Sequence, residues 1–260
     1  MRYDKDSLGT RMKGYEYAAK TKLPRRLPVI IRLDGKAFHT YTKGCAKPFD
    51  DRLISLMDAT AKHVCDNIQG AQIAYVQSDE ITILVHNYKK LNSSAWFDND
   101  IQKMASISAA LASTYFTMNS ILLGFKDSEG ANTRKVALFD SRVFVVPEHD
   151  VVNNFEWRQQ DAIRNSVQMV ARCLYSHKEC ENKNVVKLKE MILAKNMDWD
   201  QLPNKHKRGR CIYKAPVERA YSHNGEDGDM IRNEWIIDRD IPIFHEDREF
   251  IARHLKVEES

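Results

Sequence analysis

The order of apolar segments in the first 150 residues constrains the fold of this chain more than any other feature. The run LPVIIRL at 27–33 is typical of a buried strand, and Asp50 is a suitable N-cap for the helix that follows. The predicted segments are, in order, strand 27–33, helix 50–68, strands 71–77 and 81–86, helix 99–119 and strand region 135–146, which Asp140-Ser141 interrupts. This order is that of split βαβ, ferredoxin-like units. We therefore expect an α+β fold with an antiparallel sheet and helices on one of its faces.

The rest of the chain has mainly helical periodicity. The predicted elements are helices at 157–177 and 185–196, short strands around Val217 and 235–237, and a hairpin turn at 224–229. We expect a catalytic region at 1–150 and a helical and short-hairpin region at 151–260 packed on it. One continuous domain is the alternative.

Basic residues gather in two places, although the formal net charge is only +4. Residues 1–26 are rich in Lys and Arg, and residues 203–214 contain five of them and no acid. Such patches suit a phosphate backbone, and a solvated surface is the alternative interpretation of each. From the second patch we predict that Lys207, Arg208 and Arg210 bind RNA.

The cysteine content and the hydropathy of the chain bear on its location. Five cysteines form no dense framework, which indicates free thiols in a reducing compartment. No apolar run approaches the roughly 20 residues that a membrane-spanning helix needs. We therefore expect a cytoplasmic protein that does not associate with a membrane.

Carboxylates follow two predicted strands that a split βαβ unit places side by side. Asp34 ends the strand at 27–33, and Asp79 lies at the tip of the hairpin formed by the next two strands. Hard divalent cations prefer oxygen ligands, so Asp34, Asp79 and the carbonyl of Gly35 predict a magnesium site. Two such ions can catalyse phosphoryl transfer, and Glu80 is expected to orient a ligand. An ordinary Asp-Gly turn and a polar hairpin tip are the alternative.

The residues after Asp34 are suited to bind phosphate. Successive backbone N–H groups in the turn that begins at Gly35 can surround a phosphate group. Lys47 and Lys103 can then neutralise triphosphate oxygens, although taken alone each lysine is better explained as a solvated side chain.

Six motifs occur in an order that points to one family. They are RLDGKAFH (32–39), AKPFD (46–50), QSDE (77–80), WF (96–97), FDSRV (139–143) and WRQQD (157–161). Together they resemble motifs of the tRNA-histidine guanylyltransferase family, and the resemblance extends from about residue 8 to residue 240. It implies a palm-like domain that is related to template-directed polymerases but extends RNA in the 3′-to-5′ direction. ATP, or in some members GTP, activates the RNA 5′-monophosphate, and the 3′-OH of an incoming nucleoside triphosphate attacks that activated end.

The resemblance also implies roles for individual residues. It places two Mg²⁺ ions at Asp34, the Gly35 carbonyl and Asp79, with Glu80 as the acidic neighbour that completes the catalytic set. The implied nucleotide contacts are Asp34, Gly35, Lys36, Ala37, Phe38, His39, Lys47, Ser78, Asp79 and Lys103. Members are commonly homotetramers built as dimers of dimers.

Departures from the family pattern favour one branch of it. Eukaryotic enzymes that guanylylate histidine tRNA have HINNLYNT after the WRQ-x-D motif, whereas this chain has IRNSVQMV (163–170), with only Asn165 in register. The stretches CLYSHKE (173–179), NMDWDQLP (196–203) and HKRGR (206–210) resemble instead the guanylyltransferase-like branch, whose members resemble template-dependent enzymes that repair truncated tRNA 5′ ends. We expect tRNA 5′-end repair with ATP, GTP or other nucleoside triphosphates. The alternatives are a histidine-tRNA-specific guanylyltransferase, a cyclase or conventional palm enzyme, and a non-catalytic RNA-binding module.

Overall fold

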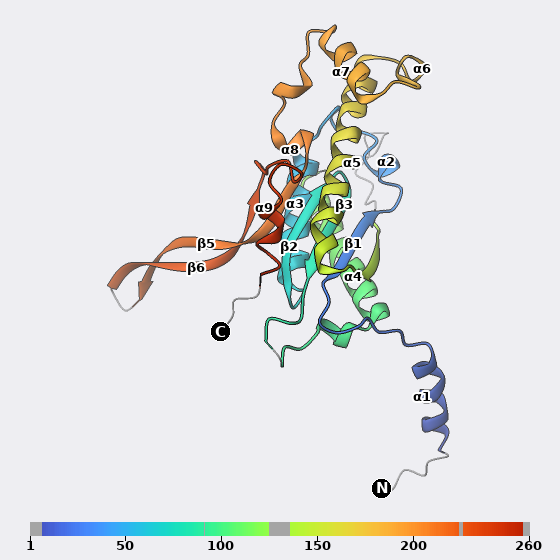
Figure 1. Ribbon diagram of the computed structural model, residues 1–260, viewed down its shortest axis with the longest axis vertical. Coiled ribbons are helices and arrows are strands. Elements are labelled where there is room, and N and C mark those ends of the chain that lie inside the picture. Colours follow the sequence, from blue (N-terminus) through green and yellow to red (C-terminus); the bar gives the residue numbers. More distant parts are fainter. Residues whose placement is uncertain (1–6, 91, 125–135, 224–225, 257–260) are drawn as a thin grey trace.

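The fold is built on one six-stranded antiparallel sheet with the strand order β4-β1-β3-β2-β5-β6 (Figure 1). This computed structural model describes residues 7–90, 92–124, 136–223 and 226–256. The strands are β1 (Val29–Gly35), β2 (Ala71–Gln77), β3 (Glu80–Val85), β4 (Phe139–Val145), β5 (Arg210–His223) and β6 (Glu226–Asp238). The predicted α+β class and antiparallel sheet are confirmed.

The helices are α1 (Leu8–Ala18), α2 (Phe38–Tyr41), α3 (Asp51–Asp66), α4 (Ile101–Leu122), α5 (Glu148–Leu174), α6 (His177–Cys180), α7 (Val185–Leu193), α8 (Asn204–Lys207) and α9 (Glu249–Ala252), with 3₁₀ turns at Trp96–Asn99 and Trp199–Gln201. Helices α3 and α4 cover one face of the sheet and α5 covers the other, whereas α1 extends away from it (Figure 1). Asp50 caps α3 as predicted, because its side chain accepts a hydrogen bond from the Arg52 backbone N–H. Within the described ranges, no helix is both long and apolar enough to cross a membrane.

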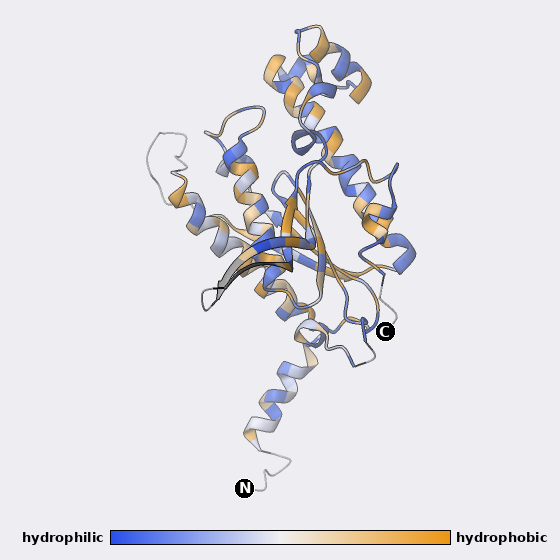
Figure 2. Ribbon diagram, turned by 90° about the vertical axis from the view of Figure 1, so that its left-hand side faces the viewer, coloured by the Kyte–Doolittle hydropathy of each residue, from blue (hydrophilic) through white to orange (hydrophobic). Residues whose placement is uncertain are grey.

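Side-chain alternation along β1 explains the two layers. Val29, Ile31 and Leu33 pack with residues of α3 and α4, whereas Ile30 packs with residues of α5 on the opposite face. Figure 2 shows the apolar residues gathered in the central strands between these helices. The expectation of helices on one face was incomplete because α5 begins at Glu148, well before the predicted start at 157. The first turns of α5 place buried side chains against the second face of the sheet.

Two other expectations differ from the structure. β4 is continuous through Asp140-Ser141, because both residues pair in register with β1. The predicted short strands near Val217 and 235–237 are parts of β5 and β6, a long hairpin that extends away from the sheet (Figure 1). Its predicted turn at 224–229 is shorter, since β6 already begins at Glu226, and residues 224–225 lie outside the described residues.

The second half of the chain also forms a helical lobe. Buried side chains of α5 and α7 form a separate core with Trp199, at the end of the molecule opposite α1 (Figure 1). The same half contributes β5, which hydrogen-bonds to β2 within the main sheet. A boundary at residue 150 stays a prediction.

Candidate active site

Strand pairing brings the predicted carboxylates together where the end of β1 meets the β2–β3 turn. Asp34 pairs in register with Glu80 on β3 and with Asp140 on β4. The backbone N–H of Gly35 donates to the carbonyl of Asp79 at 3.1 Å, which holds the end of β1 against the β2–β3 turn. The structure therefore brings together Asp34, Gly35 and Asp79, as the sequence predicted.

The turn after β1 depends on glycine at position 35. A Cβ atom there would lie 2.3 Å from the Phe38 ring, so any larger residue would displace that ring. Phe38 is 4% exposed and packs against Tyr41, with 5.2 Å between the ring centroids. Its side chain therefore belongs to the core, so any contact of Phe38 with a nucleotide would come from its backbone, and that contact stays a prediction.

The backbone of this turn is nevertheless open to a ligand. Ala37 has φ = 54°, in the left-handed region, and the Lys36 N–H donates to the Leu138 carbonyl at 2.8 Å. Among the described residues, the N–H groups of Ala37, Phe38 and His39 have no hydrogen-bond acceptor. Consecutive unpaired N–H groups are the phosphate-binding feature that the sequence predicted here. The side chains of Lys36, Ala37 and His39 are exposed.

The carboxylates carry more negative charge than their neighbours neutralise. The Asp34 side chain is 43% exposed, and the Arg142 guanidinium lies 4.0 Å from its Oδ2. Arg142 also lies 3.6 Å from Oδ1 of Asp140. Burial raises the pKa of the Asp79 carboxyl, the hydrogen bond from Ser78 opposes this, and the charges of Asp34 and Glu80 raise the pKa further. A bound cation would relieve this repulsion.

The oxygen donors fit a divalent cation that a nucleotide helps to hold. Nowhere in the described part of the chain do three or more His, Cys, Asp or Glu side chains converge on one point. Asp34, Asp79 and the Gly35 carbonyl thus form an incomplete set of hard oxygen ligands. Mg²⁺ is commonly bound in this way, by one or two carboxylates together with substrate phosphates and water.

Glu80 is engaged elsewhere. Its two oxygens accept hydrogen bonds from Nε and Nη2 of Arg158 at 2.7 and 2.6 Å, and both side chains are 10% exposed. Arg158 in turn lies 3.1 Å from Asp161 on the next turn of α5. Glu80 therefore attaches the start of β3 to α5. Sequence reasoning missed Arg158, although the WRQQD motif contains it, because the pairing joins residues that are distant in the chain.

A cavity of about 170 Å³ lies beside the β2–β3 turn. Its lining includes Lys47 and Ser78, both predicted to contact nucleotide, and apolar side chains that include Phe49 and Leu53. Ser78 has φ = 48° and is exposed. Lys103 is exposed at the start of α4 and does not line this cavity, so its role stays a prediction.

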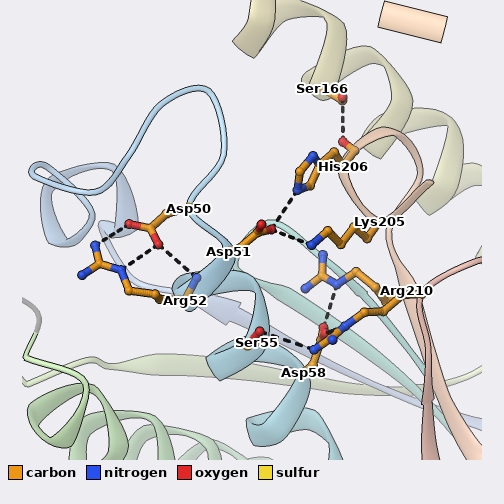
Figure 3. Close-up of polar contacts among 10 residues, drawn as sticks. Asp50, Asp51, Arg52, Ser55, Asp58, Ser166, Lys205, His206 and Arg210 are labelled. Atoms are coloured by element: carbon orange, nitrogen blue, oxygen red, sulfur yellow. Dashed lines mark hydrogen bonds and ion pairs between the residues drawn. The ribbon is translucent and has the colours of Figure 1, made fainter. Parts of the chain in front are cut away.

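The predicted RNA-binding residues lie in three different environments. Lys207 is partly buried and donates from Nζ to the Asp200 carbonyl at 2.6 Å, and Arg208 is partly buried and bonds to Asn204. Arg210 is only 3% exposed and donates from Nε to Oδ1 of Asp58 at 2.6 Å (Figure 3). A buried, ion-paired guanidinium cannot reach an RNA backbone on the surface, so the prediction for Arg210 is corrected. Lys207 and Arg208 stay predictions.

Comparisons with known proteins agree with this geometry. The family model described as tRNAHis guanylyltransferase matches residues 9–147. A solved bacterial tRNA(His) guanylyltransferase-like protein in complex with ATP is 41% identical, with a TM-score of 0.83, over 96% of this chain and 100% of its own. The complex of such a bacterial protein with GTP has 41% identity and a TM-score of 0.78, over 96% of this chain and 99% of its own. A probable tRNA(His) guanylyltransferase of Dictyostelium discoideum is 28% identical over 235 residues, which are 81% of this chain and 86% of that protein. The chain therefore belongs to the tRNAHis guanylyltransferase family and is a nucleotidyltransferase.

Proposed function

We propose that this enzyme repairs truncated tRNA 5′ ends by template-directed nucleotide addition in the 3′-to-5′ direction. The observation that carries the proposal is the uncompensated pair Asp34 and Asp79 beside open backbone N–H groups and a cavity lined by Lys47. Family membership and the ATP and GTP complexes of similar bacterial proteins support it. The IRNSVQMV stretch at 163–170 favours repair over histidine-tRNA guanylylation.

The reaction has two displacements. In the first, an oxygen of the RNA 5′-monophosphate attacks the α-phosphorus of ATP, and pyrophosphate leaves. In the second, the 3′-OH of the incoming nucleoside triphosphate attacks the RNA 5′-phosphorus, and AMP leaves. The RNA gains one nucleotide and retains a triphosphate at its new 5′ end.

The residues of this chain have distinct tasks in these steps. Asp34, Asp79 and the Gly35 carbonyl would hold Mg²⁺, which when bound supplies charge neutralisation and activates the attacking oxygen. The open N–H groups of Ala37, Phe38 and His39 bind phosphate oxygens, and Lys47 neutralises their charge. The pair of Glu80 and Arg158 fixes the β2–β3 turn, so that Asp79 keeps its position relative to Asp34.

One assay tests the proposal. Nucleotide addition is measured on 5′-monophosphorylated tRNA that lacks its first nucleotide, with Mg²⁺, ATP and the other three nucleoside triphosphates, for each of the four possible opposing bases. We expect the added nucleotide to follow the opposing base. Addition of guanosine only to histidine tRNA, whatever base lies opposite, would establish the alternative function.

Contact with tRNA is tested at Lys207 and Arg208. The double substitution to Gln is expected to weaken tRNA binding and to reduce the dependence of log K on log salt by about one phosphate contact per lost cation. Unchanged affinity across salt concentrations would show that both residues serve only the structure of the helical lobe, where Lys207 already bonds to Asp200.

We also infer that the enzyme is a homo-oligomer, with a tetramer as the expected form. None of the residues of α1 is buried, and Leu8, Tyr15 and Tyr17 are 65%, 73% and 73% exposed. A second copy of the chain would cover these apolar side chains. Sedimentation velocity tests this, and a monomer at micromolar concentration would contradict it.

A further inference from the structure

Arg210 is a buried arginine whose guanidinium is only partly used. Asp58 is fully buried and accepts hydrogen bonds from two arginines, at Oδ1 from Nε of Arg210 (2.6 Å) and at Oδ2 from Nε of Arg239 (3.0 Å). Arg239 differs because its side chain is 44% exposed and can be solvated by water. Figure 3 shows Arg210 against Asp58 below the segment that bears Lys205 and His206.

The terminal groups of Arg210 lack acceptors. Among the described residues, neither Nη group of Arg210 has a hydrogen-bond acceptor, and Nη2 is shielded from solvent. Leaving the N–H groups of a buried cation unpaired is unfavourable, and such a group calls for an explanation. A ligand that supplies an acceptor would remove the cost.

The backbone fixes this side chain in place. Arg210 pairs in register with Val76 on β2, and the preceding Gly209 has φ = +86°. A Cβ atom at Gly209 would lie 2.6 Å from the Val76 carbonyl oxygen, so only glycine permits this close approach. The Tyr75 hydroxyl also donates to the Arg208 carbonyl at 2.7 Å. The position of Arg210 is therefore set before any ligand binds.

Arg210 lies where the base of a bound nucleotide is expected. Arg210 lines the same cavity as Lys47 and Ser78, together with the apolar side chains of Phe49 and Leu53. β5 lies three strand spacings from β1, which is about 14 Å from Asp34. Phosphates at the carboxylate end therefore direct the base toward Arg210 and the apolar side chains, since a base requires flat apolar contact and a few polar groups.

We propose that Arg210 determines specificity for a purine nucleotide by donating from Nη1, the terminal group that is not shielded from solvent, to N7 of the base. A guanidinium matches N7 of a purine, and N7 with O6 of guanine, whereas pyrimidines offer no equivalent of N7. This inference rests on the proposed function, because it assumes that the activating nucleotide occupies the cavity. The inference adds to that function which chemical feature of the nucleotide is selected, namely N7 of the purine.

The test compares ATP with 7-deaza-ATP, which lacks N7, by equilibrium binding in the presence of Mg²⁺. The wild-type enzyme is expected to bind 7-deaza-ATP about 10-fold or more weakly, as for the loss of a hydrogen bond to a charged donor. Arg210→Lys retains a cation beside Asp58 but loses the guanidinium, and it is expected to bind the two nucleotides with similar affinity. Arg239→Lys is the matched control, since it contacts the same carboxylate but does not line the cavity, and it should keep the wild-type preference.

Inorganic tripolyphosphate separates a base contact from a phosphate contact. Arg210→Lys should leave tripolyphosphate binding unchanged, and thermal melting confirms that the variant is folded. Equal binding of ATP and 7-deaza-ATP by the wild type, or a preference that survives in Arg210→Lys, would overturn the inference. Weakened tripolyphosphate binding would also overturn it, by making Arg210 a phosphate contact. A wild-type enzyme that binds no ATP would instead refute the proposed function on which the inference rests.

Discussion

Two acidic centres in this protein differ in how far neighbouring arginines compensate their negative charge. At the end of β1 and the β2–β3 turn, Asp34 and Asp79 are partly exposed, and the Arg142 guanidinium lies 4.0 Å from Asp34. On α3, Asp58 is fully buried and has an arginine on each of its oxygens, at 2.6 and 3.0 Å. The first centre keeps negative charge available, and the second compensates it completely.

This difference is the one expected between the proposed catalytic centre and a structural one. A carboxylate that is fully paired in the core contributes to one native arrangement and has no remaining capacity for a ligand. Burial and the nearby charge of Asp34 raise the pKa of the Asp79 carboxyl, and carboxylates this close together favour a bound cation. Neutralising each centre should therefore have opposite consequences for activity and stability.

The largest expected effect is on activity. Asp34→Asn or Asp79→Asn keeps the size of the side chain but removes the charge, and nucleotide addition should fall by about 10³-fold or more because the metal would lose a ligand. Single-turnover assays with truncated tRNA measure this loss. Binding of tRNA should be nearly unchanged in both variants, and wild-type activity in either would remove that residue from the catalytic set.

Asp58→Asn should act on stability. The substitution leaves the buried Arg210 without a counter-charge, and breaking a buried ion pair costs about 3–5 kcal/mol. For a chain of this size the Tm should fall by roughly 10 °C. As a control, Glu190→Gln removes an exposed pair with Lys187 and should change the Tm by about 1 °C or less. Equal effects of the two substitutions would show that Asp58 is not a structural charge centre.

A smaller loss of activity is expected when Glu80, which pairs with Arg158, is substituted. Glu80→Gln keeps one hydrogen bond to Arg158 and should lower kcat by about 10-fold, whereas Glu80→Ala should lower it by about 100-fold, since small displacements of catalytic groups are costly. The KM for ATP should change little in both variants. Equal losses in the two variants, or a change confined to KM, would argue against a positioning role.

The smallest expected effect is a gain of stability at the catalytic centre without metal. The folded-state pKa of Asp79 is raised above its ordinary value of 3.8, so the folded chain binds this proton more tightly than the unfolded chain does. Stability is therefore lost as the pH rises from 3.8 through the raised pKa. With EDTA at pH 7, Asp79→Asn should raise the Tm by a few degrees, and the gain should disappear below pH 3.8. A lower Tm for the variant at pH 7 would contradict the assigned repulsion.

The sequence predicted the catalytic centre better than the structural one, for a physical reason. Asp34 and Asp79 each lie next to a strand that local patterns identify, and hairpin pairing of β3 with β2 and its register with β1 bring them together. The pairs of Asp58 with Arg210 and of Glu80 with Arg158 join residues 152 and 78 positions apart. No local pattern specifies such contacts, so Arg210 was assigned to the RNA surface from its basic neighbours alone.

The same limit explains the differences in the fold. The start of α5 at Glu148 was missed because EHDVVNNFE is polar apart from the positions that pack on the sheet. The length of β5 and β6 was missed because, in the outer part of the hairpin, the residues with described side chains (215–220 and 229–234) include none that is buried, so no apolar pattern marks a strand there. Both elements depend on tertiary contacts or on pairing with each other.

Direct binding of a divalent cation tests the central claim most directly. Mn²⁺ can replace Mg²⁺ at an oxygen site, and electron paramagnetic resonance measures its free concentration during a titration with and without ATP, corrected for the Mn²⁺ that ATP binds in the absence of enzyme. The wild-type enzyme should bind Mn²⁺ much more tightly when ATP is present, because phosphate oxygens complete the set of Asp34, Asp79 and the Gly35 carbonyl. Asp34→Asn and Asp79→Asn should lose this enhancement. Wild-type Mn²⁺ binding in both variants would contradict the account.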